Sequence, residues 1–453
     1  MTDVLTRVTV GPPAHGGHCV ARVDGRVVFV RHSAPGEVVD VRLTEAGEGR
    51  RFWRGDAVAV HEPSPDRVPS RWPDAGPGGV GGGELAHLTL ESQRRWKAEV
   101  VRDTLRRIGH LELDHLPPLT VHPLGGDDER AGLGTRTRID LVVADGGRAG
   151  MFGYRSHDVL PLTEMPLAVP AIAELDLFAP GRWDGIPART RLDVVAPSAG
   201  PALVLVDGHP VDLADPAGSF RSAARSAARA AHSGGGRRRG GRGPQGRRGR
   251  AGRDPQPARV AVRERVDSPV GELSYRVDAT GFWQVHRDAP ATLVDAVLTA
   301  ARPEPGQRLL DLYSGAGLFT LPLARAVGEG GRVDAVEVNE RAVKDARRNL
   351  HAAPQAVLHV AGVTAPVLDG LGGEGAVDAV VLDPPRSGAG KDVVAALARL
   401  RPRRIVYVAC DPAALARDLR AAVDAGYDVV ALDGYDLFPH THHVECVAVL
   451  EPR

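Results

Sequence analysis

The chain of 453 residues has few cysteines and no long apolar run, and each shortage excludes a class of protein. Its three cysteines, Cys19, Cys410 and Cys446, are too few and too scattered for a disulfide framework or an all-cysteine metal cage. No run of 18 apolar residues occurs, so we expect no membrane-spanning helix and no membrane partner. The first residues, MTDVLTRVTV, lack the charged and apolar regions of a signal peptide, and we expect a cytoplasmic protein.

Net charge is absent as well, because 57 Lys and Arg balance 57 Asp and Glu. This balance does not exclude a nucleic-acid partner, because the charges are unevenly distributed. Residues 219–259 are dominated by Arg, Gly, Ala and Ser, a composition that cannot bury a core, and we expect a disordered insertion there. Its arginines bind an RNA backbone without reading its sequence, or the segment is a passive surface insertion.

Residues 1–62 have the pattern of a small β-barrel, with short alternating apolar runs separated by glycine turns. Four arginines are interleaved with the apolar positions: Arg22, Arg26, Arg31 and Arg42. They form a positive face towards phosphates, or they are ordinary solvated residues on strand faces.

The remainder divides at two changes of pattern. A Pro- and Gly-rich linker over 63–83 leads into a central domain, 84–260, which begins with helical spacing and continues with short strands and turns. From 261 to 453, short apolar strands alternate with amphipathic helices, which predicts a doubly wound α/β sheet. The expected strands are Arg308–Asp311, Val333–Glu337, Val377–Leu382 and Ile405–Val408, and the clearest helices are Arg341–Leu350 and Ala413–Ala425.

A nucleoside-binding pocket is indicated at the ends of the first two strands. Gly315 and Gly317, in the loop after the first strand, allow a tight turn and a close approach of the backbone to a ligand. Glu337 ends the second strand, where an acid accepts hydrogen bonds from both hydroxyls of a ribose. The loop has no third glycine to cradle a pyrophosphate, which favours S-adenosylmethionine over a dinucleotide.

A third loop, DPPRSG over residues 383–388, directly follows the strand that ends at Leu382. Its two prolines fix the backbone and remove amide donors, which makes a rigid platform at the end of the strand. Arg386 stands where amino methyltransferases that act on bases place a stacking aromatic residue. The loop has no cysteine, unlike that of a 5-methylcytosine enzyme.

Cys410 closes the fourth strand, and Asp411-Pro412 is typical of a helix cap followed by the first helical residue. The positive end of that helix lowers the pKa of a neighbouring thiol, so we expect Cys410 to be a reactive thiolate rather than an inert buried cysteine. Asp411 opposes this effect.

Glu445 is a charge embedded in the last apolar strand, expected over His440–Leu450, and an ionised carboxylate there needs a partner or a function. Cys446, on the opposite face of that strand, and Cys19 are expected to pack in cores. The neighbouring histidines match no known metal-ligand spacing, and we expect no metal.

In this order, these motifs resemble those of the bacterial 5-methyluridine RNA methyltransferase family. The resemblance covers nearly the whole chain apart from the arginine insertion. Residues 1–62, with Gly16-Gly17, DGR at 24–26 and PGE at 35–37, resemble the TRAM domain, a small OB-like barrel, and the C-terminal part resembles a Rossmann-like class I methyltransferase sheet.

The resemblance implies roles for individual residues. Cys410 resembles the family's nucleophile and Glu445 its base. The implied cofactor contacts, in a site for S-adenosylmethionine, are Gln284, Tyr313, Gly315, Gly317, Glu337 and Asp383. Leu318 replaces one polar cofactor contact of the family.

Some family members also hold a four-iron cluster on cysteines. The matching positions here are residues 72–83 and Met165, which contain no cysteine, so we expect no iron–sulfur cluster.

The expected reaction is methylation of carbon 5 of a uridine, flipped out of a structured tRNA or ribosomal RNA, through a covalent Cys410 adduct. We expect no obligate protein partner. Two alternatives remain: methylation of cytosine or of a protein side chain, and a non-catalytic RNA-binding protein on a methyltransferase scaffold.

Overall fold

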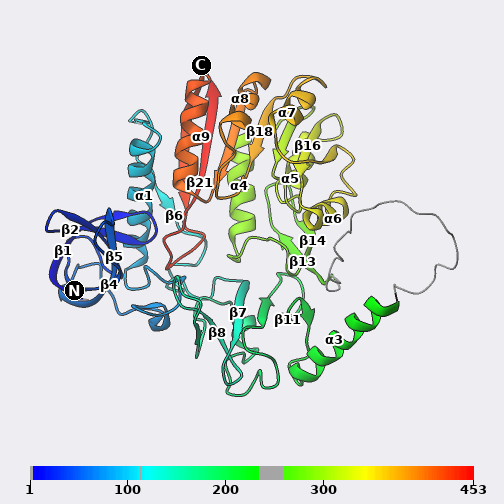
Figure 1. Ribbon diagram of the computed structural model, residues 1–453. Helices are drawn as coiled ribbons and strands as arrows, with labels where there is room; N and C mark the ends of the chain where they lie inside the picture. Colours follow the sequence, from blue (N-terminus) through cyan, green and yellow to red (C-terminus); the bar gives the residue numbers. More distant parts are fainter. Residues whose placement is uncertain (1–3, 113, 234–258) are drawn as a thin grey trace, which may run out of the picture.

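The computed structural model describes residues 4–112, 114–233 and 259–453, which form an N-terminal barrel, a central sheet and a large C-terminal sheet (Figure 1). Five strands close the barrel in the order β1-β2-β3-β5-β4, as the alternating pattern predicted. Their bounds are β1 (Val4–Ala14), β2 (His18–Val23), β3 (Arg26–Arg31), β4 (Val38–Glu45) and β5 (Phe52–Glu62). Alternate valines such as Val28, Val30, Val39 and Val41 fill its interior, together with Cys19.

The barrel arginines do not form one free basic face. Arg31 is buried, and its guanidinium donates hydrogen bonds of 2.9 and 3.0 Å to Asp56 and stacks on the ring of Tyr154 at 3.4 Å. Arg26 lies over the ring of Trp53 at 4.3 Å. Arg31 therefore joins the barrel to the central sheet, because Tyr154 belongs to that sheet's β8–β9 connection.

The central part is an antiparallel sheet in the order β12-β11-β10-β7-β8-β9. Its elements are β7 (Arg138–Ala144), β8 (Arg148–Phe152), β9 (Val159–Pro161), α2 (Pro170–Ala173), β10 (Arg191–Val195), β11 (Leu203–Val206) and β12 (His209–Pro210). The linker ahead of it contains a single turn of 3₁₀ helix, Pro73–Ala75. Trp72 and Met165, two of the positions that the resemblance pointed to as cluster-ligand sites, are buried in one hydrophobic cluster with Val80.

Helix α3 (Pro216–Ser233) corrects the expectation of disorder over its part of 219–259, and residues 234–258 lie outside the described ranges. The side chain of Asp215 accepts a hydrogen bond from the amide of Gly218 (2.9 Å), which satisfies a free donor at the helix start. Ala217 and Phe220 pack against the central cluster. Alanine-rich sequence also has high helix propensity, so local structure forms despite the low hydrophobicity. In Figure 1 the helix projects from the central sheet.

The C-terminal sheet has eight strands in the order β17-β16-β15-β18-β19-β21-β20-β6. The first five are parallel, and β21 runs antiparallel to its neighbours β19 and β20. The bounds are β6 (Val121–His122), β15 (Arg308–Leu312), β16 (Arg332–Glu337), β17 (Ala356–Val360), β18 (Ala379–Leu382), β19 (Arg404–Ala409), β20 (Tyr427–Tyr435) and β21 (Glu445–Pro452). A hairpin, β13 (Ala261–Val266) and β14 (Leu273–Asp278), precedes it.

Helices cover both faces of this sheet, which confirms the doubly wound class. Successive residues of one strand enter opposite cores: Leu309 and Val381 join one cluster, whereas Leu310 and Val380 join the other. The first cluster includes residues of α4 (Ala289–Ala301), α5 (Thr320–Val327) and α6 (Glu340–Asn349). The second includes residues of α1 (Leu90–Arg107), α7 (Ala365–Gly372), α8 (Lys391–Leu400) and α9 (Pro412–Asp424).

Two elements from the expected central domain, 84–260, belong to the C-terminal sheet instead. Strand β6 pairs with β20, through Val121 with Gly434, and α1 packs beside α9. Both contacts join segments about 300 residues apart, so no local sequence pattern predicts them. Among the described residues, no helix combines the length and apolar character needed to cross a bilayer.

Candidate active site

Two loops meet where the strand order reverses. From β15 the chain passes outward through β16 to β17, and it then returns to β18 and β19 on the other side of β15. Ligands of such sheets bind at this reversal, outside the carboxyl ends of the strands. The glycine loop over residues 313–319 follows β15, and the DPPRSG loop over 383–388 follows β18, so both lie at this point.

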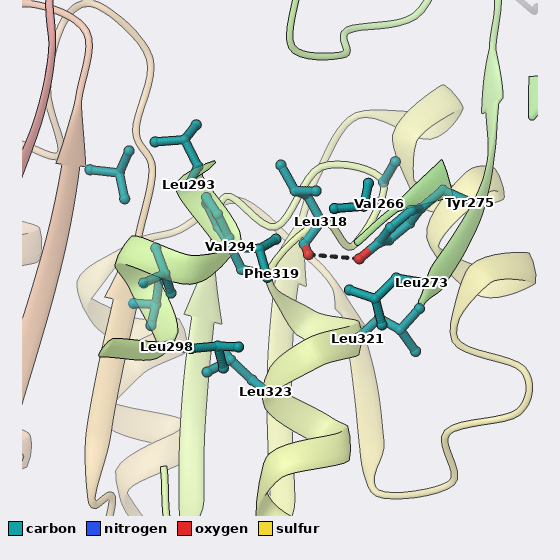
Figure 2. Packing of buried hydrophobic residues seen from close by; sticks show 14 of the residues in the cluster. Val266, Leu273, Tyr275, Leu293, Val294, Leu298, Leu318, Phe319, Leu321 and Leu323 are labelled. Atoms are coloured by element: carbon teal, nitrogen blue, oxygen red, sulfur yellow. Dashed lines mark hydrogen bonds between the residues drawn. The ribbon is translucent and has the colours of Figure 1, made fainter. Parts of the chain in front are cut away.

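The glycine loop turns back sharply through the left-handed region of φ. Tyr313 has φ of 62°, Gly315 of 57° and Gly317 of 91°. A Cβ atom at Gly315 would meet nothing within 4 Å, so open space lies beside this backbone. Leu318 is buried in the hydrophobic core, and its carbonyl accepts a hydrogen bond from the Tyr275 hydroxyl (2.9 Å; Figure 2). At that position the loop is anchored to the core.

Glu337, at the end of β16, is held by three backbone amides. Its Oε2 accepts from the amide of Gly315 (2.9 Å), and its Oε1 accepts from Val338 (2.8 Å) and Asn339 (2.6 Å). These bonds fix the carboxylate against the glycine loop. An acid oriented in this way is suited to the ribose of a nucleoside.

Three carboxylates surround the ends of β15, β16 and β18. Burial, with repulsion from Asp383 and Glu337, raises the pKa of Asp311 to about 7, although Asp311 accepts a hydrogen bond of 2.5 Å from Thr320. Burial also raises the pKa of Asp383 to about 7. Asp311 Oδ1 is buried without a hydrogen-bond partner in the described structure. An acidic pocket with an unsatisfied oxygen fits the sulfonium and ammonium charges of S-adenosylmethionine.

Helix α9 holds the DPPRSG loop in place through Asp418. One oxygen of Asp418 accepts hydrogen bonds from the amide of Ala389 (2.7 Å) and the hydroxyl of Tyr407 (2.6 Å). Gly388 has φ of 87°, and a Cβ there would lie 2.6 Å from the same carboxylate. The platform formed by the prolines is therefore fixed from the side of α9.

Cys410 and Glu445 lie opposite one another at the ends of two antiparallel strands. The last registered pair of β19 and β21 is Ala409 with Cys446, so the next residues outward are Cys410 and Glu445. The strand expected from His440 begins only at Glu445, because Thr441 turns back to bond Phe438. Cys446 is buried in a core, as expected.

Electrostatics set the resting state of this pair. Burial, followed by repulsion from Glu445 and Asp383, raises the pKa of Cys410 to about 11 and outweighs the opposing charge of Arg386. The expectation that a helix terminus lowers this pKa is therefore wrong. Burial and then repulsion from Asp383 raise the pKa of Glu445 well above its usual value. In the described structure, the Glu445 carboxyl accepts no hydrogen bond, unlike Glu337.

Gln284 is buried and lines a cavity of about 410 Å³ between the central and C-terminal sheets, which none of the other predicted site residues lines. Within the described ranges, one group has metal-like spacing: Asp127, His286 and Asp288. Its atoms are already engaged, since His286 bonds Asp127 and accepts from the Asp288 amide, and Arg130 pairs with both carboxylates.

The sequence prediction missed two residues that lie at the candidate site, Asp311 and His15. Asp311 carried a usable signal, since it precedes the glycine loop in an apolar strand. His15, in the hairpin between β1 and β2, carried none: its Nε2 lies 3.8 Å from Asp411 Oδ2, beside Cys410.

A doubly wound sheet with an acidic nucleoside pocket and a cysteine facing a buried glutamate defines a class I methyltransferase. Three family models match: the TRAM domain over residues 6–58, the methyltransferase small domain over 282–401, and tRNA (uracil-5-)-methyltransferase over 373–453.

Relatives match over nearly the full length. A 23S rRNA (uracil(1939)-C(5))-methyltransferase of Methylococcus capsulatus is 35% identical over 454 residues, which cover 97% of this chain and 95% of the relative. An uncharacterized RNA methyltransferase of Streptomyces avermitilis is 42% identical and covers 98% of both chains. The crystal structure of Pyrococcus abyssi tRNA (uracil-54, C5)-methyltransferase with S-adenosyl-L-homocysteine has the same fold, with a TM-score of 0.63 and 23% identity over 98% of this chain and 100% of that one. This protein belongs to the RNA uracil-C5 methyltransferase family.

Proposed function

We propose that this protein methylates carbon 5 of one uridine in large-subunit ribosomal RNA, with Cys410 as nucleophile and Glu445 as base. The observation that carries the mechanism is the pairing of these two side chains across β19 and β21, at the carboxyl end of β19. The choice of ribosomal RNA over tRNA rests on full-length relatives named for 23S rRNA, at 35% and 32% identity. RNA is the substrate, S-adenosylmethionine the methyl donor, and the cytoplasm the proposed location.

Carbon 5 of uracil is a weak nucleophile, so it needs activation. Once its thiol proton is lost to solvent, the sulfur of Cys410 adds to carbon 6, and the electron pair this displaces makes carbon 5 nucleophilic. S-adenosylmethionine supplies the methyl group from its sulfonium centre. Glu445 then takes the proton from carbon 5, and carbon–sulfur cleavage releases Cys410. A carboxyl whose pKa is raised by burial is a stronger base for this step than a solvated one.

Glu337 would hold the ribose of the cofactor, while Asp311 and Asp383 would face its positive charges. Gly315 and Gly317 leave room for it beside the loop backbone. The rigid DPPRSG loop would hold Asp383 between the cofactor and the target uracil.

Mass spectrometry of nucleosides tests this proposal. Ribosomal RNA and tRNA from cells without the gene are compared before and after rescue with the wild-type protein, Cys410→Ala or Cys446→Ala. We expect 5-methyluridine to return to large-subunit RNA with the wild type and with Cys446→Ala, a matched cysteine removed from the core, but not with Cys410→Ala. Return in tRNA alone would overturn the choice of RNA, and no change in either pool would contradict the function.

A further inference from the structure

The hairpin between β1 and β2 brings the barrel to the mouth of the catalytic site. Gly17 has φ of 76°, and a Cβ there would lie 2.9 Å from Cβ of Glu84 and 3.5 Å from that of His442. His442 lies in the loop that leads into Glu445. The tip of the hairpin is therefore packed closely against the segment that positions the base, and this packing fixes where His15 stands.

His15 is held loosely there. Its Nε2 lies 3.8 Å from Asp411 Oδ2, longer than a hydrogen bond, and about half of its side chain (53%) is exposed. The other oxygen of Asp411 caps α9 by accepting from the amide of Ala414 (2.8 Å). The ring of His442 stands edge-on to His15, at 5.9 Å between centroids. His15 therefore keeps an imidazole free for a further partner next to Cys410.

Arg386 faces the same space from the DPPRSG loop. Its side chain is exposed and makes no hydrogen bond or ion pair with any residue that the structure describes. Its loop follows β18, which pairs with β19, the strand that leads into Cys410. The positive charge of Arg386 acts to lower the pKa of His15, Cys410 and Glu445, so the guanidinium lies within electrostatic range of all three. Two basic side chains from distant parts of the chain thus converge at the opening of an otherwise acidic pocket.

We propose that His15 and Arg386 together bind a backbone phosphate of the nucleotide whose base enters the pocket. This inference rests on the proposed function. A uridine that reaches Cys410 must leave its stack, so its own phosphates come to the opening of the pocket. There Asp383, Asp411 and Glu445 would repel them. The guanidinium of Arg386 offsets that repulsion, and both it and the His15 imidazole donate hydrogen bonds to the phosphate oxygens.

The barrel then has two separable roles. The exposed arginines of the barrel would add only general attraction to RNA, whereas its first hairpin would contribute directly to the site that holds the target nucleotide. A different explanation is that His15 only docks the barrel on Asp411. The two differ in one respect: docking does not depend on the charge of a single phosphate in the RNA.

The test uses the full-length protein and an RNA hairpin containing the mapped target uridine. This hairpin is made with normal linkages, or with one neutral methylphosphonate on the 5′ or the 3′ side of that uridine. We expect one methylphosphonate to lower kcat/KM of the wild type by about 10-fold, the effect of one charge-assisted hydrogen bond. His15→Gln and Arg386→Gln should lose a similar factor on normal RNA, with little further loss on the methylphosphonate.

Arg22→Gln is the matched control, because Arg22 is an exposed arginine of the same barrel. This variant should lower kcat/KM on normal and on methylphosphonate RNA by the same factor. Affinity for S-adenosylhomocysteine should be unchanged in the His15 variant, which verifies folding. The proposal is overturned if the His15 and Arg386 variants lose the same factor on all three RNAs, or lose nothing. Failure of the proposed function is distinguishable, since the wild type would then not methylate normal RNA at all.

Discussion

Two glutamates end up at the same edge of one sheet in opposite environments. Glu337 accepts hydrogen bonds from three backbone amides, the longest of them 2.9 Å. Glu445 is buried opposite Cys410, and its carboxyl has no hydrogen-bond partner in the described structure. The amide bonds hold the first carboxylate in one orientation, whereas burial destabilises the second as an anion.

This difference separates binding from proton transfer. A carboxylate held by three backbone amides keeps one orientation, which suits it to binding a ligand. A buried carboxyl without donors has a raised pKa, which is what a general base needs near neutral pH. Residue type alone does not distinguish the two carboxylates.

Glu445→Gln should have the largest effect. Without a base for the carbon 5 proton, turnover should fall by about 10²- to 10⁴-fold, and the covalent complex with ordinary uridine RNA should accumulate. A denaturing gel detects the adduct, and calorimetry should find binding of S-adenosylhomocysteine unchanged. Normal turnover in this variant would rule out Glu445 as the base.

Lys97→Met should destabilise the loop that leads to Glu445 and leave the cofactor pocket around Glu337 unchanged. Lys97 is fully buried in α1, donates to Asp436, and donates a 3.0 Å hydrogen bond to the carbonyl of Phe438, in the loop leading to Glu445. Removing one partner of a buried ion pair costs about 3–5 kcal/mol of stability. Differential scanning calorimetry should show a lower melting temperature, and replacing Asp436 by Leu as well should restore much of it. An unchanged melting temperature would contradict this role.

Glu337→Ala should weaken binding of the cofactor without affecting the Cys410–Glu445 pair. It removes a charged acceptor facing the ribose, worth about 1.5–3 kcal/mol, so the Kd for S-adenosylhomocysteine should rise by about 10- to 100-fold. Titration calorimetry measures this change. At saturating S-adenosylmethionine, 5-fluorouridine RNA should still trap Cys410 after methyl transfer, because the fluorine on carbon 5 cannot be removed as a proton. Loss of this trapping would mean that cofactor binding and covalent chemistry are not separable.

The smallest effect concerns the pH dependence of Cys410. Because its pKa is raised to about 11, the thiolate fraction and the rate of alkylation by iodoacetamide should rise about tenfold per pH unit from about pH 7 to 10. Glu445→Gln removes a source of repulsion, so the curve should move to lower pH. A shift to higher pH would show that Glu445 does not act on the thiol through its charge.

The positions of Asp383 and Cys410 were predictable because each directly follows a strand. Apolar runs located the ends of the strands before Asp383 and Cys410, and parallel strands bring such ends to one edge. What sequence could not supply was the balance of charges there: the helix terminus beside Cys410 suggested a low pKa, but burial and two carboxylates prevail.

Composition misled us over α3. Low hydrophobicity predicted disorder from residue 219, yet Ala217 and Phe220 give the helix an anchor, and alanine favours helix without burial. His15 had no signal of its own, because its contact with Asp411 joins residues about 400 positions apart.

The position of β6 affects how the chain is made. This short strand completes the edge of the C-terminal sheet, but its partner β20 is synthesised about 310 residues later. At about 5–20 residues per second, the ribosome needs roughly 15–60 s to supply that partner. Throughout this interval β6 and the face of α1 that packs on α9 present apolar surface without these native neighbours, while the barrel and the central sheet can already fold. Newly made chains are therefore most vulnerable to aggregation at this segment, where a chaperone would be most useful.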